Sequence, residues 1–277
     1  FAGQMARHTL HNSVKQLVST GATFDQTSAY FSGKGEGRAI INPVSKSGFT
    51  VLQIKVDELS AGKNLAGKAY KGLITGMPGN LTGAELLQLM LEKAAETDNG
   101  FDPLTGYDYT QLISKFTMGA VFYNQAVDSY LDEKLAADTK PNNKAYKEGA
   151  AYTGKEHVWD EAFGYFGAPA HTLDLTANDV YLIAKQKPEG FAKADYNGDG
   201  NVSLVNEMAY AHAYYAAGFD KGGKTAYLHT IVQAFVDGRN LITAANGEAL
   251  TDSERSELVA YAQVIKTQWQ RLIAEAV

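Results

Sequence analysis

The most informative segment of the chain is Glu156-His157-Val158-Trp159-Asp160-Glu161-Ala162-Phe163-Gly164-Tyr165-Phe166-Gly167. On a helix, His157, Asp160 and Glu161 are spaced i, i+3 and i+4, so they share one face. The aromatic side chains of the same stretch fall on other faces and require apolar neighbours. This pattern predicts a helix packed in a helical core. Its polar face is either a functional centre or a buried hydrogen-bonded network that fixes helix packing.

The rest of the chain also shows helical periodicity and helix boundary signals. Capping-box sequences begin predicted helices at Thr82 and Thr251, and Thr176 is a third cap. Strand signals are few, so we predict an all-α fold of packed bundles. We expect one domain over 1–277, built as two packed bundles with a division near 137–154. The predicted helices cover Gln4–Leu17, Leu81–Thr97, Tyr109–Ala136 and Met208–Val236, and a last helix runs to Ala276. The Met208–Val236 segment is either one helix or two joined near Gly222-Gly223. Residues 22–48 are predicted to be loop.

Composition limits the classes of function. The 277 residues include 25 Lys and Arg against 31 Asp and Glu, a formal charge of −6, with no long basic stripe. Nucleic acid is therefore not an expected partner. The chain has no cysteine, which excludes disulfides and thiolate chemistry. No apolar run approaches the roughly 18 residues that a membrane helix needs, so no membrane span is predicted.

A second motif resembles the start of an EF-hand calcium loop. Asp195, Asn197 and Asp199 supply oxygen side chains at positions 1, 3 and 5, and Gly200 allows the turn at position 6. Alternate residues of such a tight loop point inward, where Ca²⁺ takes six to eight oxygens. The predicted ligands are Asp195, Asn197, Asp199, Asn201 through its carbonyl, Ser203, Asn206 and Glu207.

The end of this motif departs from the EF-hand pattern. Position 12 normally holds a bidentate Glu, but here it is Asn206, and Glu207 follows one residue later. The alternative is an Asx-rich turn without a metal. We predict a structural Ca²⁺ that holds the start of a helix over 203–217.

Four segments, in order, resemble an uncharacterised bacterial family, a domain of unknown function, related to the imelysins. They are the 156–165 stretch above, Gly3-Gln4-Met5-Ala6-Arg7, Met118-Gly119-Ala120-Val121-Phe122-Tyr123-Asn124-Gln125-Ala126-Val127 with Tyr130-Leu131, and the loop at 195. The resemblance implies an all-α imelysin-like fold of two helical bundles. It also implies a periplasmic or outer-membrane associated, often lipid-anchored protein, frequently tied to iron acquisition.

The resemblance is incomplete at the motif of the imelysins proper, Gly-x-His-x-x-Glu. Here Gly154 lies three residues before His157, and Asp160 stands at the Glu position, followed by Glu161. Two functions follow. The first is an extracytoplasmic binding protein for a metal ion, a metal complex or an envelope protein, with His157, Asp160 and Glu161 as a second candidate site for iron or another transition metal. The alternative is a metal-dependent, peptidase-like hydrolase that uses the same residues.

Overall fold

The computed structural model describes residues 1–277 except Pro78, Ala136, Ala137 and Val277. The described chain is mostly α-helical, which confirms the predicted all-α class. Its one named sheet is a short antiparallel pair, β1 (Phe101–Asp102) and β2 (Tyr107–Asp108), with Phe101 opposite Asp108. None of the described helices combines the length and the apolar character that crossing a membrane requires.

The chain divides into two compact units. Unit 1 contains Phe1, 125–202 and 206–277, and unit 2 contains 2–124 and 203–205. The change of unit therefore falls after Asn124, inside a helical segment. The predicted division near 137–154 into two bundle halves stays a prediction.

Unit 2 is built around its first helix, which packs on four of the others in the same unit. The first helix was predicted to end at Leu17 and ends at Ser19, shortly before Gly21, whose φ of +74° suits a glycine. The elements are α1 (Ala2–Ser19), α2 (Phe24–Phe31), α3 (Val56–Leu59), η1 (Ala66–Lys68), α4 (Gly83–Ala95), α5 (Tyr109–Thr117) and the first part of η2 (Met118–Lys134), which follows a wider π-helical backbone.

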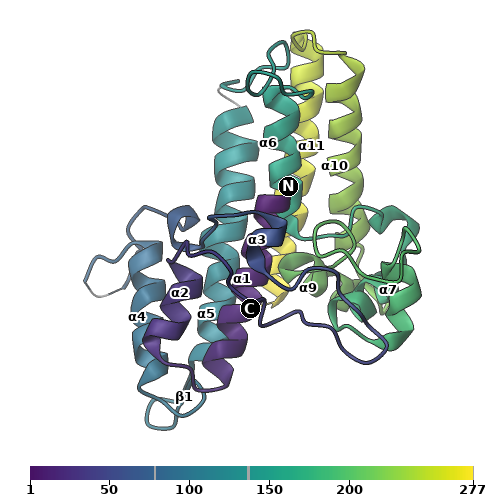
Figure 1. Ribbon diagram of the computed structural model, residues 1–277. Coiled ribbons are helices and arrows are strands. Elements are labelled where there is room, and N and C mark those ends of the chain that lie inside the picture. Colours follow the sequence, from purple (N-terminus) through teal and green to yellow (C-terminus); the bar gives the residue numbers. More distant parts are fainter. Residues whose placement is uncertain (78, 136–137, 277) are drawn as a thin grey trace. The chain divides into compact units, whose positions relative to one another are not determined.

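Unit 1 contains a group of long helices that run side by side, α6, α10 and α11, with α9 packed against them (Figure 1). Its elements are the second part of η2, α6 (Gly154–Phe166), η3 (Thr172–Asp174), α7 (Ala177–Ala184), η4 (Pro188–Gly190), α8 (Phe191–Ala194), α9 (Ala211–Asp220), α10 (Tyr227–Ala244) and α11 (Asp252–Ala276).

Threonine capping boxes set where several of these helices begin. Thr82 accepts a hydrogen bond from the backbone N–H of Glu85, and the Glu85 carboxylate accepts one from the N–H of Thr82. The same reciprocal pattern joins Thr176 to Asp179 and Thr251 to Glu254, which confirms the predicted caps. Thr153 forms a capping box with Glu156, and helix α6, which carries the 156–167 segment, begins there.

The core of unit 1 is aromatic, and both tryptophans of the chain lie in it. Trp269 is fully buried, with the ring of Phe166 at 5.0 Å. Trp159 is 2 % exposed, and its indole N–H donates to the carbonyl of Phe235 at 2.8 Å. The Trp159 ring lies so close to Gly238 that a Cβ there would stand 2.2 Å from Cζ2. The aromatic face of α6 is therefore a packing surface, as predicted.

Two local predictions were wrong, and a third that left two alternatives open is decided. Residues 22–48 are not all loop, because Thr23 and Gln26 form a capping box that starts α2. No helix covers 203–217: the chain after the 195 loop makes turns, and helix α9 starts only at Ala211. The stretch 208–236 holds two helices, the second of the alternatives considered, and they are separated by turns at 221–226.

Candidate functional site

Helix α6 carries the first predicted site, and its polar side chains separate into two groups. His157 and Glu161 face each other, with Nε2 and Oε2 3.5 Å apart. Asp160 instead pairs with Arg239 of α10, its Oδ1 lying 2.9 Å from the guanidinium Nε. The helical spacing correctly predicted that His157, Asp160 and Glu161 share a face. In the structure, however, Asp160 pairs with Arg239 of α10 and not with the other two.

Arg239 joins α10 to α6 through two carboxylates. Besides Asp160, it donates through Nη1 to Oε1 of Glu156 at 2.9 Å. The Glu156 side chain is only 14 % exposed, so this pair is partly shielded from water. Burial raises the pKa of Asp160, and the Arg239 charge opposes that shift. The arrangement is that of an inter-helix ion-pair network, and Arg239 was not identified from the sequence.

His157 lies under two tyrosine rings. The Tyr146 ring stacks on the imidazole with centroids 3.5 Å apart, and Tyr152 lies at 5.6 Å from it. Burial lowers the pKa of His157, while Glu161 acts in the opposite direction. The imidazole is thus favoured in its neutral form. Neither tyrosine was a sequence candidate, because both precede α6 in an irregular segment with no periodic signal.

Among the residues that the structure describes, no three His, Asp or Glu side chains gather as a group able to hold a metal ion. His157, Asp160 and Glu161 are thus not brought together as a three-ligand set. A catalytic metal typically needs three protein ligands and an open position. A Ca²⁺ site is a different case, because amide, hydroxyl and backbone oxygens also serve as its ligands.

The loop that begins at Asp195 has the local geometry of a cation-binding turn. The two carboxylate oxygens of Asp195 accept from the N–H groups of Asp199 and Gly200, at 3.0 and 2.9 Å. The side-chain oxygen of Asn197 also accepts from Asp199 N–H, at 2.9 Å, and Asp199 Oδ1 accepts from Asn201 N–H at 2.9 Å. Alternate side chains therefore fold inward over the backbone. Gly200, at φ +85°, occupies the left-handed region that the turn requires.

The structure distinguishes the two candidates for the last ligand of this loop. Glu207 is 2 % exposed, and its Oε1 accepts from Asn197 N–H at 3.4 Å. Asn206 is exposed, and its carbonyl accepts from the N–H of Ala170. The Glu207 carboxylate therefore faces the loop, one residue later than the EF-hand pattern places it.

Ser203, another of the predicted ligands, is not part of unit 1. It belongs to unit 2, where its hydroxyl accepts from Val205 N–H at 3.3 Å. Within unit 1, the loop contacts described above involve five of the predicted ligands: Asp195, Asn197, Asp199, Asn201 and Glu207. These residues are hereafter called the Asx loop.

The fold and these sites define a mostly α-helical protein with an inter-helix ion-pair network and an Asx loop. The chain belongs to the family described as Domain of unknown function (DUF4856), whose model matches residues 90–275. Neither the curated proteins nor the solved structures include a significant match to it.

Proposed function

We propose that the protein is a non-enzymatic, calcium-stabilised binding protein of the bacterial cell envelope. The observation that carries the calcium part is the inward arrangement of Asp195, Asn197 and Asp199, with the buried Glu207 carboxylate against the same turn. Hard oxygen ligands at alternate positions suit Ca²⁺. A cation bound by these oxygens would also offset the repulsion between the two aspartates of the turn.

The experiment is thermal unfolding of the full chain after chelation, followed by addition of Ca²⁺ or Mg²⁺. At a concentration 100 times Kd, bound Ca²⁺ stabilises by about 2.7 kcal/mol. We expect Ca²⁺ to restore the unfolding temperature lost on chelation and Mg²⁺ to restore little of it. An unfolding temperature that is unchanged by both chelation and Ca²⁺ rejects the proposal.

Asp195→Ala should abolish the Ca²⁺ effect. The matched control is Asp102→Ala. Asp102 also lies in an exposed turn, and its carboxylate accepts a hydrogen bond from the N–H of Leu104, two residues later. The control should keep the full Ca²⁺ response. Equal responses from the two variants would locate the cation elsewhere.

The envelope location and the link to iron acquisition rest on the imelysin resemblance of the quoted segments. The test is fractionation of cells that express the full-length protein, together with calorimetric titration of the purified chain with Fe²⁺ and ferric citrate. Recovery in the cytoplasm argues against the location, and absence of binding argues against the iron role. The hydrolase alternative is not proposed, because Asp160 is engaged by Arg239 and no third metal ligand accompanies His157 and Glu161 among the described residues.

A further inference from the structure

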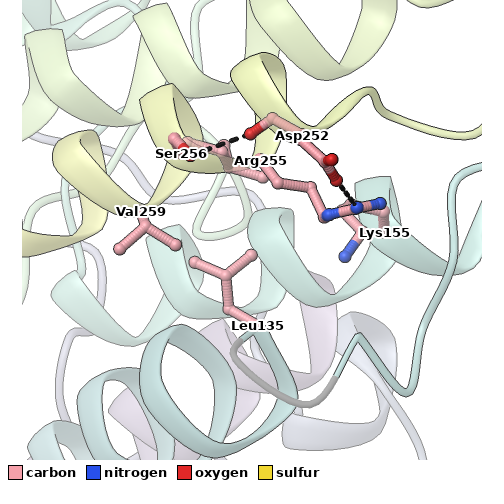
Figure 2. Close-up of a pocket in the computed structure, with 7 residues that line it drawn as sticks. Leu135, Lys155, Asp252, Arg255, Ser256 and Val259 are labelled. Carbon is pink, nitrogen blue, oxygen red and sulfur yellow. Dashed lines mark hydrogen bonds and ion pairs between the residues drawn. The ribbon is translucent and has the colours of Figure 1, made fainter.

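A pocket of about 520 Å³ lies in unit 1, and none of its lining residues belongs to the two sites above. Helix α11 supplies most of its lining, Lys155 comes from α6, and Leu135 directly follows η2. Figure 2 shows Leu135 and Val259 pointing toward each other, with the nitrogens of Lys155 and Arg255 at another end of the pocket. The volume is in the range of pockets that hold small molecules.

The polar end of this pocket holds two basic side chains, Lys155 and Arg255, and each pairs with a carboxylate. Lys155 is 5 % exposed and pairs with the Asp138 carboxylate, so a buried ammonium stands at the pocket wall. Arg255 pairs with Asp252, whose side chain is 96 % exposed. An exposed pair of this kind contributes little to stability, so the guanidinium can exchange that carboxylate for another at small cost. Its planar fork suits a carboxylate ligand.

The other end of the pocket is aliphatic, and a second hollow lies next to it between η2 and α11. A smaller hollow of about 90 Å³ shares Val259 and is lined further by Val127, Leu131 and Ala262. Lys266 and Asp132, which pair at 3.2 Å, also line it. From Arg255 to Lys266, helix α11 extends about 16 Å at 1.5 Å per residue. The two hollows therefore place aliphatic side chains between the ion pairs at Arg255 and Lys266.

We propose that this pocket binds a linear aliphatic carboxylate. The carboxylate lies between Lys155 and Arg255, and the hydrocarbon chain follows Leu135, Val259 and the smaller hollow. Val259 is 50 % exposed, so covering it removes apolar surface from water. A ligand without the negative charge makes no charge-assisted contact with Lys155 or Arg255. The proposal does not depend on the calcium or iron functions above.

The test is calorimetric titration of the full chain with decanoate, decan-1-ol and decyltrimethylammonium, each below its micelle-forming concentration. We expect saturable binding of one decanoate per chain. The alcohol and the cation should bind at least tenfold more weakly, because they lack the charge-assisted contacts. Equal affinity for the three amphiphiles, or no decanoate binding, overturns the proposal.

Two matched variants on α11 locate the site. Val259→Glu places a carboxylate in the proposed path of the chain, whereas Val264→Glu makes the same change at a 40 % exposed position that lines neither hollow. Val259→Glu should abolish binding, and Val264→Glu should keep it within twofold. Arg255→Gln, a change at a half-exposed side chain, should weaken decanoate at least tenfold and leave decan-1-ol unchanged. Loss of binding in Val264→Glu, or an unchanged affinity in Val259→Glu, overturns the proposal.

Discussion

The polar face of α6 and the Asx loop were both predicted as cation sites from residue spacing, but their side chains have different kinds of partner in the structure. On α6, Asp160 and Glu156 turn to Arg239, far away in sequence. In the Asx loop, Asp195, Asn197 and Asp199 turn to N–H groups within five residues. A helix face takes its role from the element that packs on it, whereas a short turn specifies its own geometry.

The most severe test of this contrast concerns the packing of α6 on α10. Gly238→Ala inserts a methyl group 2.2 Å from the Trp159 ring, so backbone or ring must move. We expect a loss of about 3 kcal/mol in the free energy of unfolding, the upper end for overpacking. Chemical denaturation measures it.

Trp159→Phe provides the control for Gly238→Ala. The smaller ring makes room for the methyl group, so the double variant should lose less than the sum of the two single variants. Strict additivity would show that the Gly238 backbone, not the close approach of the ring, determines the cost.

The second test breaks the ion-pair network. Arg239→Met keeps the aliphatic stem but leaves the Glu156 and Asp160 carboxylates without their cation. We expect a loss of about 2 kcal/mol, less than for a fully buried pair because Arg239 is 31 % exposed. Lys266→Met, which removes an exposed pair with Asp132, should cost under about 1 kcal/mol. Equal losses of stability in the two variants would show that the ion-pair network on α6 contributes no more than an exposed surface pair.

The third test concerns the shifted last position of the Asx loop. Glu207→Gln should weaken Ca²⁺ binding at least tenfold, which removes about 1.4 kcal/mol of calcium stabilisation. Asn206→Ala should change the affinity little, because the Asn206 contact to Ala170 is made by its backbone. Calorimetric titration with Ca²⁺ measures both affinities. A larger loss of affinity in Asn206→Ala than in Glu207→Gln would show that the last ligand stands at the regular EF-hand position.

The smallest effect is the pH dependence of His157. Burial lowers its pKa in the folded state, so the unfolded chain binds the proton more readily. The stability linked to this group is present above the unfolded pKa of about 6.5 and declines as the pH falls below it. His157→Phe keeps a ring against Tyr146 and should reduce the fall in unfolding temperature between pH 7.5 and 5.5. An identical fall in both proteins would contradict the burial of the imidazole.

Local signals made much of this fold predictable. The all-α class, the caps at Thr82, Thr176 and Thr251 and the end of α1 near Gly21 all depend on residues a few positions apart. The Asx loop begins as predicted for the same reason. Helix α2 was missed because its short Phe24–Phe31 sequence shows little periodicity among the surrounding Gly, Ser and Thr residues.

Long-range pairing was not predictable from one sequence. Nothing near Arg239 indicates that it meets Glu156, 83 positions away. The stacking of Tyr146 on His157 depends on the path of an irregular segment, and the division after Asn124 falls inside a helix without a composition change. Spacing identifies which side chains share a face, but it does not identify what that face meets.

The burial of Trp159 and Trp269 has a practical consequence. These are the only tryptophans in the sequence, and both belong to unit 1. Their fluorescence therefore reports the opening of that unit alone, whereas far-ultraviolet circular dichroism averages the helices of both. Coincident melting curves from the two signals would mean that the units unfold as one cooperative system, and separate curves would make each unit a folding module of its own.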